Sequence, residues 1–304
     1  MFKPEGVYVA MLTPFKDDGS INEKELRRIV DFQIANGVDG LFPGGSCGES
    51  IHMTREEKEQ LFEIVADQAA GRVSVLPGIS GTTPRESICL AEKAKALGCP
   101  AVVAAPPHFF PINQEMMEKY FEEIADAVDL SVILYNIPLF STPISYDVVK
   151  RLSRRVNIVG MKDSSGSMVD FIHFMDKVRL VGEDLSFLTG REETLFSCLA
   201  TGGQGCMTAS SGILPEYLVS IYRAFKNGDI ERAKELQFSI LLAVRSMFGL
   251  PFPIGFKVAM ETRGFKMGPP RQPLSHAEQF NYRTMKTRIE KVMNSVLQNV
   301  PETA

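Results

Sequence analysis

The chain has 304 residues, of which 44% are hydrophobic and 23% charged, and it carries a formal net charge of −4. These proportions are typical of a globular protein that buries a sizeable core without disulfides or structural metals. The small negative charge and the lack of a basic stripe exclude nucleic acid and anionic membranes as expected partners.

Eight short apolar segments predict buried strands along the chain. Most are continuous apolar runs rather than strict alternations, which is typical of parallel strands covered on both faces. The eight segments are residues 7–12, 40–45, 73–79, 101–106, 131–138, 158–163, 185–190 and 205–209.

Amphipathic segments between these runs predict helices. Ser20 and Glu23 have the spacing of a capping box at the start of the first helix, and Thr54 and Glu57 repeat it in the second. The predicted helices are residues 20–37, 54–71, 83–98, 113–128, 145–154, 167–178, 191–201 and 215–227.

Eight strand-then-helix units in a chain of this length favour an α/β fold of the (β/α)8 TIM-barrel type. An open doubly wound sheet is disfavoured because no G-x-G-x-x-G follows the first strand and no P-loop is present. Three further helices are predicted at residues 229–249, 253–263 and 275–298. We therefore expect a barrel over residues 1–227 that carries the active site. A C-terminal three-helix appendage over residues 228–304 should pack on it, since no linker separates the two.

In such a barrel the chemistry lies at the carboxyl ends of the strands. Lys162 ends an apolar strand within NIVGMKDSSG (157–166). A buried ammonium is costly unless it is paired or neutralised. Lys162 is therefore either paired with Asp163 or another carboxylate, or kept for its amine, which could form a Schiff base with a carbonyl substrate. Lys257 is a second candidate, but it lies in a helical pattern where reaching solvent is the simpler interpretation.

Two other strand ends carry distinctive residues. Tyr135 follows four apolar residues, and it is either a core tyrosine or a proton relay beside a reacting amine. The segment GGSCGES (44–50) could form a nest of backbone N–H groups to which Ser46 adds a hydroxyl. It lacks the lysine of a Walker loop, so a carboxylate fits better than a triphosphate. A tight loop that needs glycine is an equally good interpretation of this segment.

Other site types are less well supported. The four histidines, His52, His108, His173 and His276, never occur at i, i+4 spacing, which disfavours a metal site, although an Asp/Glu magnesium site stays open. GGSCG is a short match to a nucleophile elbow, but nothing around it singles out Ser46 as a nucleophile. The five cysteines form no CxxC pair, and no signal peptide or membrane-length apolar stretch is present. We therefore expect a cytoplasmic protein.

The motifs GGSCGES, YNIP, GMKD and TGREE together resemble, in order and spacing, the dihydrodipicolinate synthase / N-acetylneuraminate lyase family, over residues 5 to about 275. The resemblance implies a (β/α)8 barrel that assembles as a homotetramer, a dimer of dimers. It also implies a lysine that binds or releases pyruvate as a Schiff base, with neither cofactor nor metal.

Position by position, the resemblance assigns roles to single residues. Lys162 matches the Schiff-base lysine and Tyr135 the tyrosine that relays protons beside it. Ser46 and Cys47 match the two positions that hold the pyruvoyl carboxylate, and Gly48 and Glu49 complete that motif. The remaining matches line the pyruvate pocket (Gly190 and Met207) or, in the neuraminate lyase branch, contact substrate hydroxyls (Glu192 and Glu193).

The sequence departs from the dihydrodipicolinate synthases at three positions. Phe140 stands where those enzymes have the arginine that grips the carboxylate of aspartate semialdehyde. Phe109 aligns with a tyrosine that the neighbouring subunit lends to the proton relay, and a phenyl ring cannot relay protons. Cys47 replaces a threonine, and a thiol is a weak hydrogen-bond partner. The segment around Phe109 looks more like the neuraminate lyase and 2-keto-3-deoxy sugar acid aldolase branches.

The leading hypothesis is a metal-free class I aldolase or lyase that joins pyruvate to an aldehyde or cleaves a 2-keto acid into them. The acidic pair suggests a hydroxylated substrate tail, as in a 2-keto-3-deoxy sugar acid or a sialic acid, whereas Phe109, Phe110 and Phe140 suggest a partly apolar pocket. Three alternatives remain: a 4-hydroxy-tetrahydrodipicolinate (dihydrodipicolinate) synthase, a 2-keto acid dehydratase or deaminase, and a non-catalytic pyruvate-binding regulator.

Overall fold

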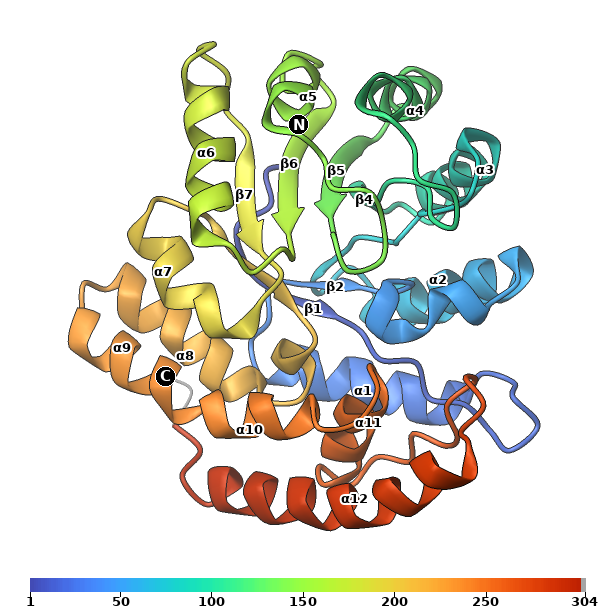
Figure 1. Ribbon diagram of the computed structural model, residues 1–304, viewed down its shortest axis with the longest axis vertical. Helices are drawn as coiled ribbons and strands as arrows, with labels where there is room; N and C mark the ends of the chain where they lie inside the picture. Colours follow the sequence, from blue (N-terminus) through green and yellow to red (C-terminus); the bar gives the residue numbers. More distant parts are fainter. Residues whose placement is uncertain (302–304) are drawn as a thin grey trace.

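The computed structural model describes residues 1–301 and confirms the (β/α)8 barrel (Figure 1). Each strand overlaps one of the eight predicted apolar segments, although the third is only two residues long. The strands are β1 (Gly6–Ala10), β2 (Gly40–Phe42), β3 (Ser74–Val75), β4 (Ala101–Ala104), β5 (Ser131–Asn136), β6 (Ile158–Asp163), β7 (Ser186–Thr189) and β8 (Gly205–Thr208).

All strand pairs are parallel, and their hydrogen-bonded order is β3-β2-β1-β8-β7-β6-β5-β4. The two outer strands meet through a parallel bridge between Gly78 and Val103. There the Ile79 N–H donates to the Val103 carbonyl at 2.9 Å. The sheet is therefore a nearly closed barrel, and the carboxyl ends of all its strands lie on one rim.

Seven helices return the chain from one strand to the next, and an eighth follows the last strand. The capping box of Thr54 and Glu57 is confirmed. The predicted box of Ser20 and Glu23 is wrong, because the Ser20 hydroxyl bonds the neighbouring Asp18 and Asn22 caps the helix instead. The helices are α1 (Glu23–Ala35), α2 (Arg55–Ala69), α3 (Pro84–Ala96), α4 (Gln114–Ala127), α5 (Tyr146–Leu152), α6 (Met168–Arg179), α7 (Leu195–Ala200) and α8 (Pro215–Lys226).

The C-terminal extension contains α9 (Ile230–Ser239), α10 (Leu241–Met247), α11 (Ile254–Glu261) and α12 (His276–Leu297). Residues 229–249, predicted as one helix, form two that meet at Ile240, where the Ser239 hydroxyl donates to the Leu236 carbonyl at 2.7 Å. Such a side-chain bond to a carbonyl in the preceding turn competes with the backbone bonds of the helix. Figure 1 shows α12 running along the outer side of α10 and α11. Buried residues of the extension belong to the same hydrophobic cluster as the strands. Its division from the barrel as a separate domain stays a prediction.

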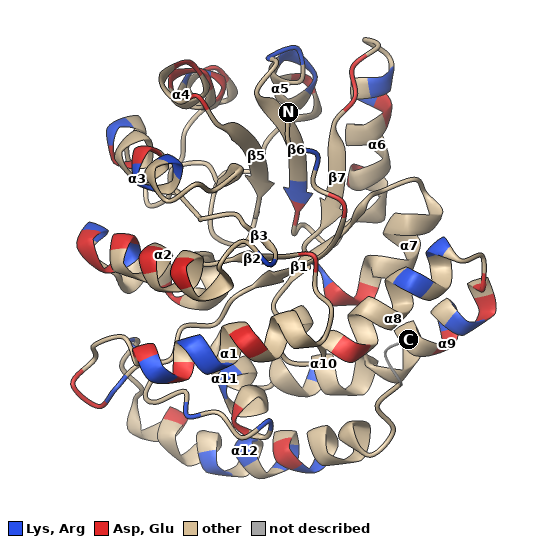
Figure 2. Cartoon of the chain, turned by 180° about the vertical axis from the view of Figure 1, so that it is seen from behind, with Lys and Arg blue, Asp and Glu red and all other residues tan. Residues whose placement is uncertain are grey.

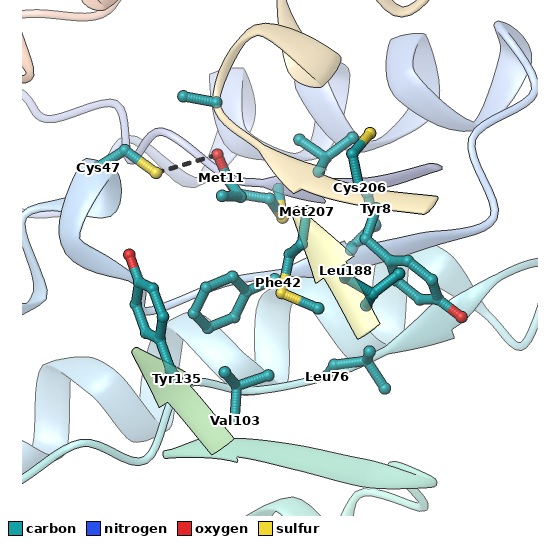
Figure 3. Close-up of a cluster of buried hydrophobic side chains, with 14 of the residues drawn as sticks. Tyr8, Met11, Phe42, Cys47, Leu76, Val103, Tyr135, Leu188, Cys206 and Met207 are labelled. Carbon is teal, nitrogen blue, oxygen red and sulfur yellow. Dashed lines mark hydrogen bonds between the residues drawn. The ribbon is translucent and has the colours of Figure 1, made fainter. Parts of the chain in front are cut away.

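The barrel interior is filled by side chains from several strands. Figure 3 shows the Phe42 ring between Tyr135 and Met207, with Leu188 and Leu76 close by. These residues are buried. The interior is therefore a packed core. Within residues 1–301, no helix combines the length and the apolar character needed to cross a membrane.

Candidate active site

Lys162 lies near the carboxyl end of β6, and Asp163 is the last residue of that strand; Figure 2 shows this strand tip carrying a basic and then an acidic residue. The register of β5 and β6 places Lys162 beside Tyr135. Lys162 is 3% exposed, and its Nζ lies 4.0 Å from the centre of the Tyr135 ring and 4.7 Å from that of Phe42. No carboxylate of residues 1–301 lies within ion-pair distance of the Lys162 Nζ. The amine thus lies between two aromatic rings.

The Tyr135 hydroxyl contacts the loop after β2, and the Tyr135 ring contacts the Lys162 amine. Tyr135 is 4% exposed, and its Oη lies 3.2 Å from the Ser46 Oγ, so either hydroxyl can donate. Figure 3 shows the phenol end of Tyr135 directed away from the packed core and toward the side of the barrel that carries Cys47. A hydroxyl pair beside a buried amine can move a proton to or from a reacting group.

The loop after β2 contains a short 3-10 turn, Ser46–Gly48. Gly44 has a φ of +75°, which glycine adopts without strain. A Cβ at Gly48 would lie 2.9 Å from the Met11 carbonyl oxygen, so this position also needs glycine. The glycines therefore let the loop pack closely on β1 and present Ser46 at the rim.

Cys47 points back into the protein. Its Sγ donates to the Ala10 carbonyl at 3.2 Å, as drawn in Figure 3. Burial raises the pKa of the Cys47 thiol to about 11, so it is protonated at neutral pH. Cys47 can therefore offer substrate its backbone N–H, whereas its side chain anchors the loop.

The strand end that carries Lys162 is braced from both sides. The Asn136 amide donates to the Asp163 carboxylate at 2.7 Å, and the Ser165 hydroxyl donates to its other oxygen at 2.7 Å. Burial raises the pKa of Asp163. On the other side, a Cβ at Gly190 would lie 1.9 Å from the Ser164 Oγ and 2.8 Å from the Lys162 Cε. Only glycine at position 190 leaves room for this lysine side chain.

The acidic pair after β7 bonds residues of the loops that follow β7 and β8. Glu192 is 3% exposed and its carboxylate accepts the Ser210 N–H at 3.1 Å, and burial raises its pKa. Glu193 pairs with Arg191 at 3.4 Å. Met207 is fully buried on β8. Substrate contacts by these residues stay predictions.

A cleft of about 590 Å³ opens at the rim, and its wall includes Ser46, Tyr135 and Phe140. Phe140 is 46% exposed and its ring centre lies 5.9 Å from that of Phe252. Phe109 also lines the cleft, but it is 86% exposed and has a φ of +81°. Lys162 contacts the Tyr135 ring and is not itself part of the cleft wall.

Sequence reasoning missed several residues of this region. The sequence places Phe42 in a strand and Asn136 in the YNIP motif, but it predicts no role for either residue. The interpretation of Lys257 as a lysine that reaches solvent is wrong, because it is 3% exposed and pairs with Glu49. The charge of Lys257 among the apolar residues of α11 indicates that it needs a buried partner, but it does not indicate which one. Among residues 1–301, no group of three or more His, Cys, Asp or Glu is arranged to hold a metal ion.

The chain is similar to proteins of one family over most of its length. The model of the dihydrodipicolinate synthetase family matches residues 3–292. The chain is 33% identical to the 4-hydroxy-tetrahydrodipicolinate synthase of Methanopyrus kandleri, over 96% of this chain and 97% of that protein. It is 34% identical to the enzyme of the same name from Bartonella bacilliformis, over 89% and 92% of the two chains.

Two solved structures share the fold. Dihydrodipicolinate synthase from Aquifex aeolicus has a TM-score of 0.89 at 28% identity, covering 99% of this chain and 100% of that one. YagE, a prophage protein of the dihydrodipicolinic acid synthase family from E. coli K12, has a TM-score of 0.88 at 28% identity, covering 96% and 98%. That structure is a complex with pyruvate.

Proposed function

The chain belongs to the dihydrodipicolinate synthetase family, and from this premise we propose that it joins pyruvate to an aldehyde, or cleaves a 2-keto acid, through a Schiff base on Lys162. Family membership makes the chain a pyruvate-dependent lyase. It thereby disfavours the alternative of a non-catalytic regulator. The residues that carry the reaction and the identity of the aldehyde are part of the proposal.

In the proposed reaction the neutral Lys162 amine attacks the C2 carbonyl of pyruvate and water leaves, giving an iminium. Loss of a methyl proton then gives an enamine, whose carbon attacks the aldehyde carbonyl. Hydrolysis of the new iminium releases the product and restores the amine. The Tyr135 hydroxyl carries protons in these steps, and Ser46 passes them on or holds the pyruvate carboxylate together with the N–H groups of its loop.

One observation supports this proposal most directly. The Lys162 amine is buried, has no carboxylate partner within the part of the chain that the structure describes, and lies against the ring of a tyrosine whose hydroxyl contacts Ser46. A Schiff-base mechanism needs a lysine amine with hydroxyl groups beside it that can move protons, and these three side chains supply that arrangement.

The relatives favour aspartate semialdehyde as the aldehyde partner. The two relatives described above are named 4-hydroxy-tetrahydrodipicolinate synthase and are similar over nearly their whole lengths. They support the synthase reaction better than the sugar acid reaction that the sequence alone put first. A synthase is accordingly the first reaction to test.

Phe140 favours a second candidate. Its ring lines the cleft where the resemblance implies a carboxylate-binding arginine in synthases, and it packs near Phe252. An apolar wall offers a substrate carboxylate no charge-assisted hydrogen bond, a contact worth about 1.5–3 kcal/mol. This supports an aldehyde without a carboxylate at that position, such as the fragment released from a 2-keto-3-deoxy sugar acid.

A substrate panel separates these candidates. Purified protein is given pyruvate with aspartate semialdehyde in one arm and a series of 2-keto-3-deoxy acids in another, and consumption or release of pyruvate is measured. Turnover in the first arm supports the synthase, and turnover in the second supports the sugar acid lyase. Loss of water or ammonia from a 2-keto acid without pyruvate release would instead support a dehydratase or deaminase. A homotetramer stays a prediction, which light scattering of the purified protein tests.

A further inference from the structure

A buried ion pair lies behind the loop that carries Ser46. Glu49, which follows the Ser46–Gly48 turn, has a side chain that is only 1% exposed and pairs with the Lys257 ammonium, whose side chain is 4% exposed. Lys257 belongs to α11 of the C-terminal extension. The pair therefore joins the candidate carboxylate-binding loop to a part of the chain about 200 residues away.

Arg271 holds the same carboxylate from a second direction. Its backbone N–H donates to the other Glu49 oxygen at 2.8 Å. Its guanidinium bonds Glu57 on α2 and, at 2.8 Å, the His52 carbonyl just after the loop. Both Lys257 and Arg271 place their charged groups over the Phe15 ring, at 4.5 and 4.3 Å from its centre. The extension thus holds the loop through the Lys257 ammonium and the Arg271 backbone N–H, and both of these cationic residues also pack on Phe15.

The backbone conformation of Glu49 indicates why its side chain is bound in this way. Glu49 has φ 59° and ψ 31°, a left-handed conformation that non-glycine residues seldom adopt. Glycine would serve better there if the position had only to end the turn. A glutamate in this conformation, with its carboxylate buried and doubly bound, indicates that the side chain is kept to fix the loop.

We propose that Glu49 is a positioning residue for pyruvate: held by Lys257 and the Arg271 N–H, it fixes the Ser46–Gly48 turn in the geometry that receives the pyruvate carboxylate. The C-terminal extension is then part of the substrate site. This inference rests on the proposed function, because it concerns the same pyruvate site. It assigns Glu49 no contact with substrate and no proton transfer.

The test measures the pyruvate concentration at which half of the protein forms the Schiff-base adduct, which borohydride traps. The variants are Glu49→Gln, Lys257→Met and the two combined, because each single change leaves one buried charge without its partner and the double change removes both. The matched control is Arg263→Met. Arg263 pairs with Glu216 on α8 in a similarly shielded ion pair, and neither residue lines the cleft.

We expect each single variant to raise the half-saturating pyruvate concentration about tenfold or more, because small misplacements of binding groups are costly. The adduct at saturating pyruvate should still reach one per chain. The double variant should lie closer to wild type than either single variant, since the two changes are coupled. Arg263→Met should lower the unfolding temperature and leave the half-saturating concentration unchanged.

Glu49→Asp covers the case in which Glu49→Gln fails to fold. Aspartate keeps the charge and tolerates left-handed backbone, but its carboxylate is drawn back by one methylene. We expect it to fold and to raise the half-saturating concentration severalfold. The inference would be overturned if the Glu49 variants had the same half-saturating pyruvate concentration as Arg263→Met. It would also be overturned if the double variant raised that concentration by the combined effect of the two single changes. Wild-type protein that forms no adduct would overturn the proposed function itself.

Discussion

Tyr135 and Lys162 are neighbours in the register of β5 and β6, and the Lys162 Nζ lies 4.0 Å from the centre of the Tyr135 ring. The parallel pairing puts both side chains at the same rim of the barrel. The Tyr135 hydroxyl also contacts Ser46, which lies in the loop after β2. The proposed chemistry depends on this arrangement of three side chains.

Tyr135→Phe should lower kcat by about 100- to 10,000-fold, because it removes the proposed acid–base group. Adduct formation at long times should persist, since Lys162 is unchanged. Tyr120→Phe is the matched control: it also removes a buried hydroxyl contact, that of Tyr120 with Ser87 at 2.8 Å, outside the cleft wall. Steady-state kinetics of both variants test the role. Equal turnover of Tyr135→Phe and wild type would rule out a proton relay through Tyr135.

Gly190→Ala should reduce the rate of adduct formation by about tenfold or more. The new Cβ would lie 2.8 Å from the Lys162 Cε and 1.9 Å from the Ser164 Oγ, so the reactive side chain must move. Gly182→Ala is the control, because Gly182 has a φ of +73° and open space around it. It should cost about 1 kcal/mol of stability and no activity. Rapid-quench trapping measures the rate of adduct formation in both variants. A Gly190→Ala rate equal to that of wild type would show that Lys162 does not need the space at position 190.

Much of this site could be predicted from the sequence, because strand ends in a parallel barrel share one rim. The positions of Lys162, Tyr135 and Ser46 follow from where apolar runs stop. The Glu49–Lys257 pair could not be predicted, because no local pattern tells which partner a charge in an apolar helix finds. The break at Ile240 was missed for a related reason: apolar residues continue through it, so the periodicity predicts one unbroken helix.

Phe140→Arg should raise kcat/KM for aspartate semialdehyde by about 10- to 100-fold, because it supplies a charge-assisted hydrogen bond at the cleft wall. Leu139→Arg adds the same charge one residue away, at a side chain that is 71% exposed and does not line the cleft. It should have little effect. A Phe140→Arg variant no better than Leu139→Arg would show that position 140 does not face the substrate carboxylate.

Asp163 should make stability depend on pH in the acidic range. Burial raises its pKa above the ordinary 3.8, so in the window just above 3.8 the folded chain holds a proton that the unfolded chain has released. Stability from this group is present below that window and is lost as the pH rises through it. The free energy of unfolding of Asp163→Asn minus that of wild type should therefore increase with pH across the window. Urea titrations between about pH 3.5 and 7 test this, and a constant difference would contradict it.

The central claim is that the Lys162 amine forms a Schiff base with pyruvate. The most direct test is to incubate the protein with pyruvate, reduce it with borohydride, and measure the mass of the intact chain and its peptides. We predict one reduced pyruvate per chain on the Lys162 peptide, and none in Lys162→Ala or Lys162→Arg, because neither replacement can form the imine. Folding of both variants is checked by circular dichroism. A wild-type chain without an adduct, or an adduct that persists on another lysine in Lys162→Ala, would contradict the account.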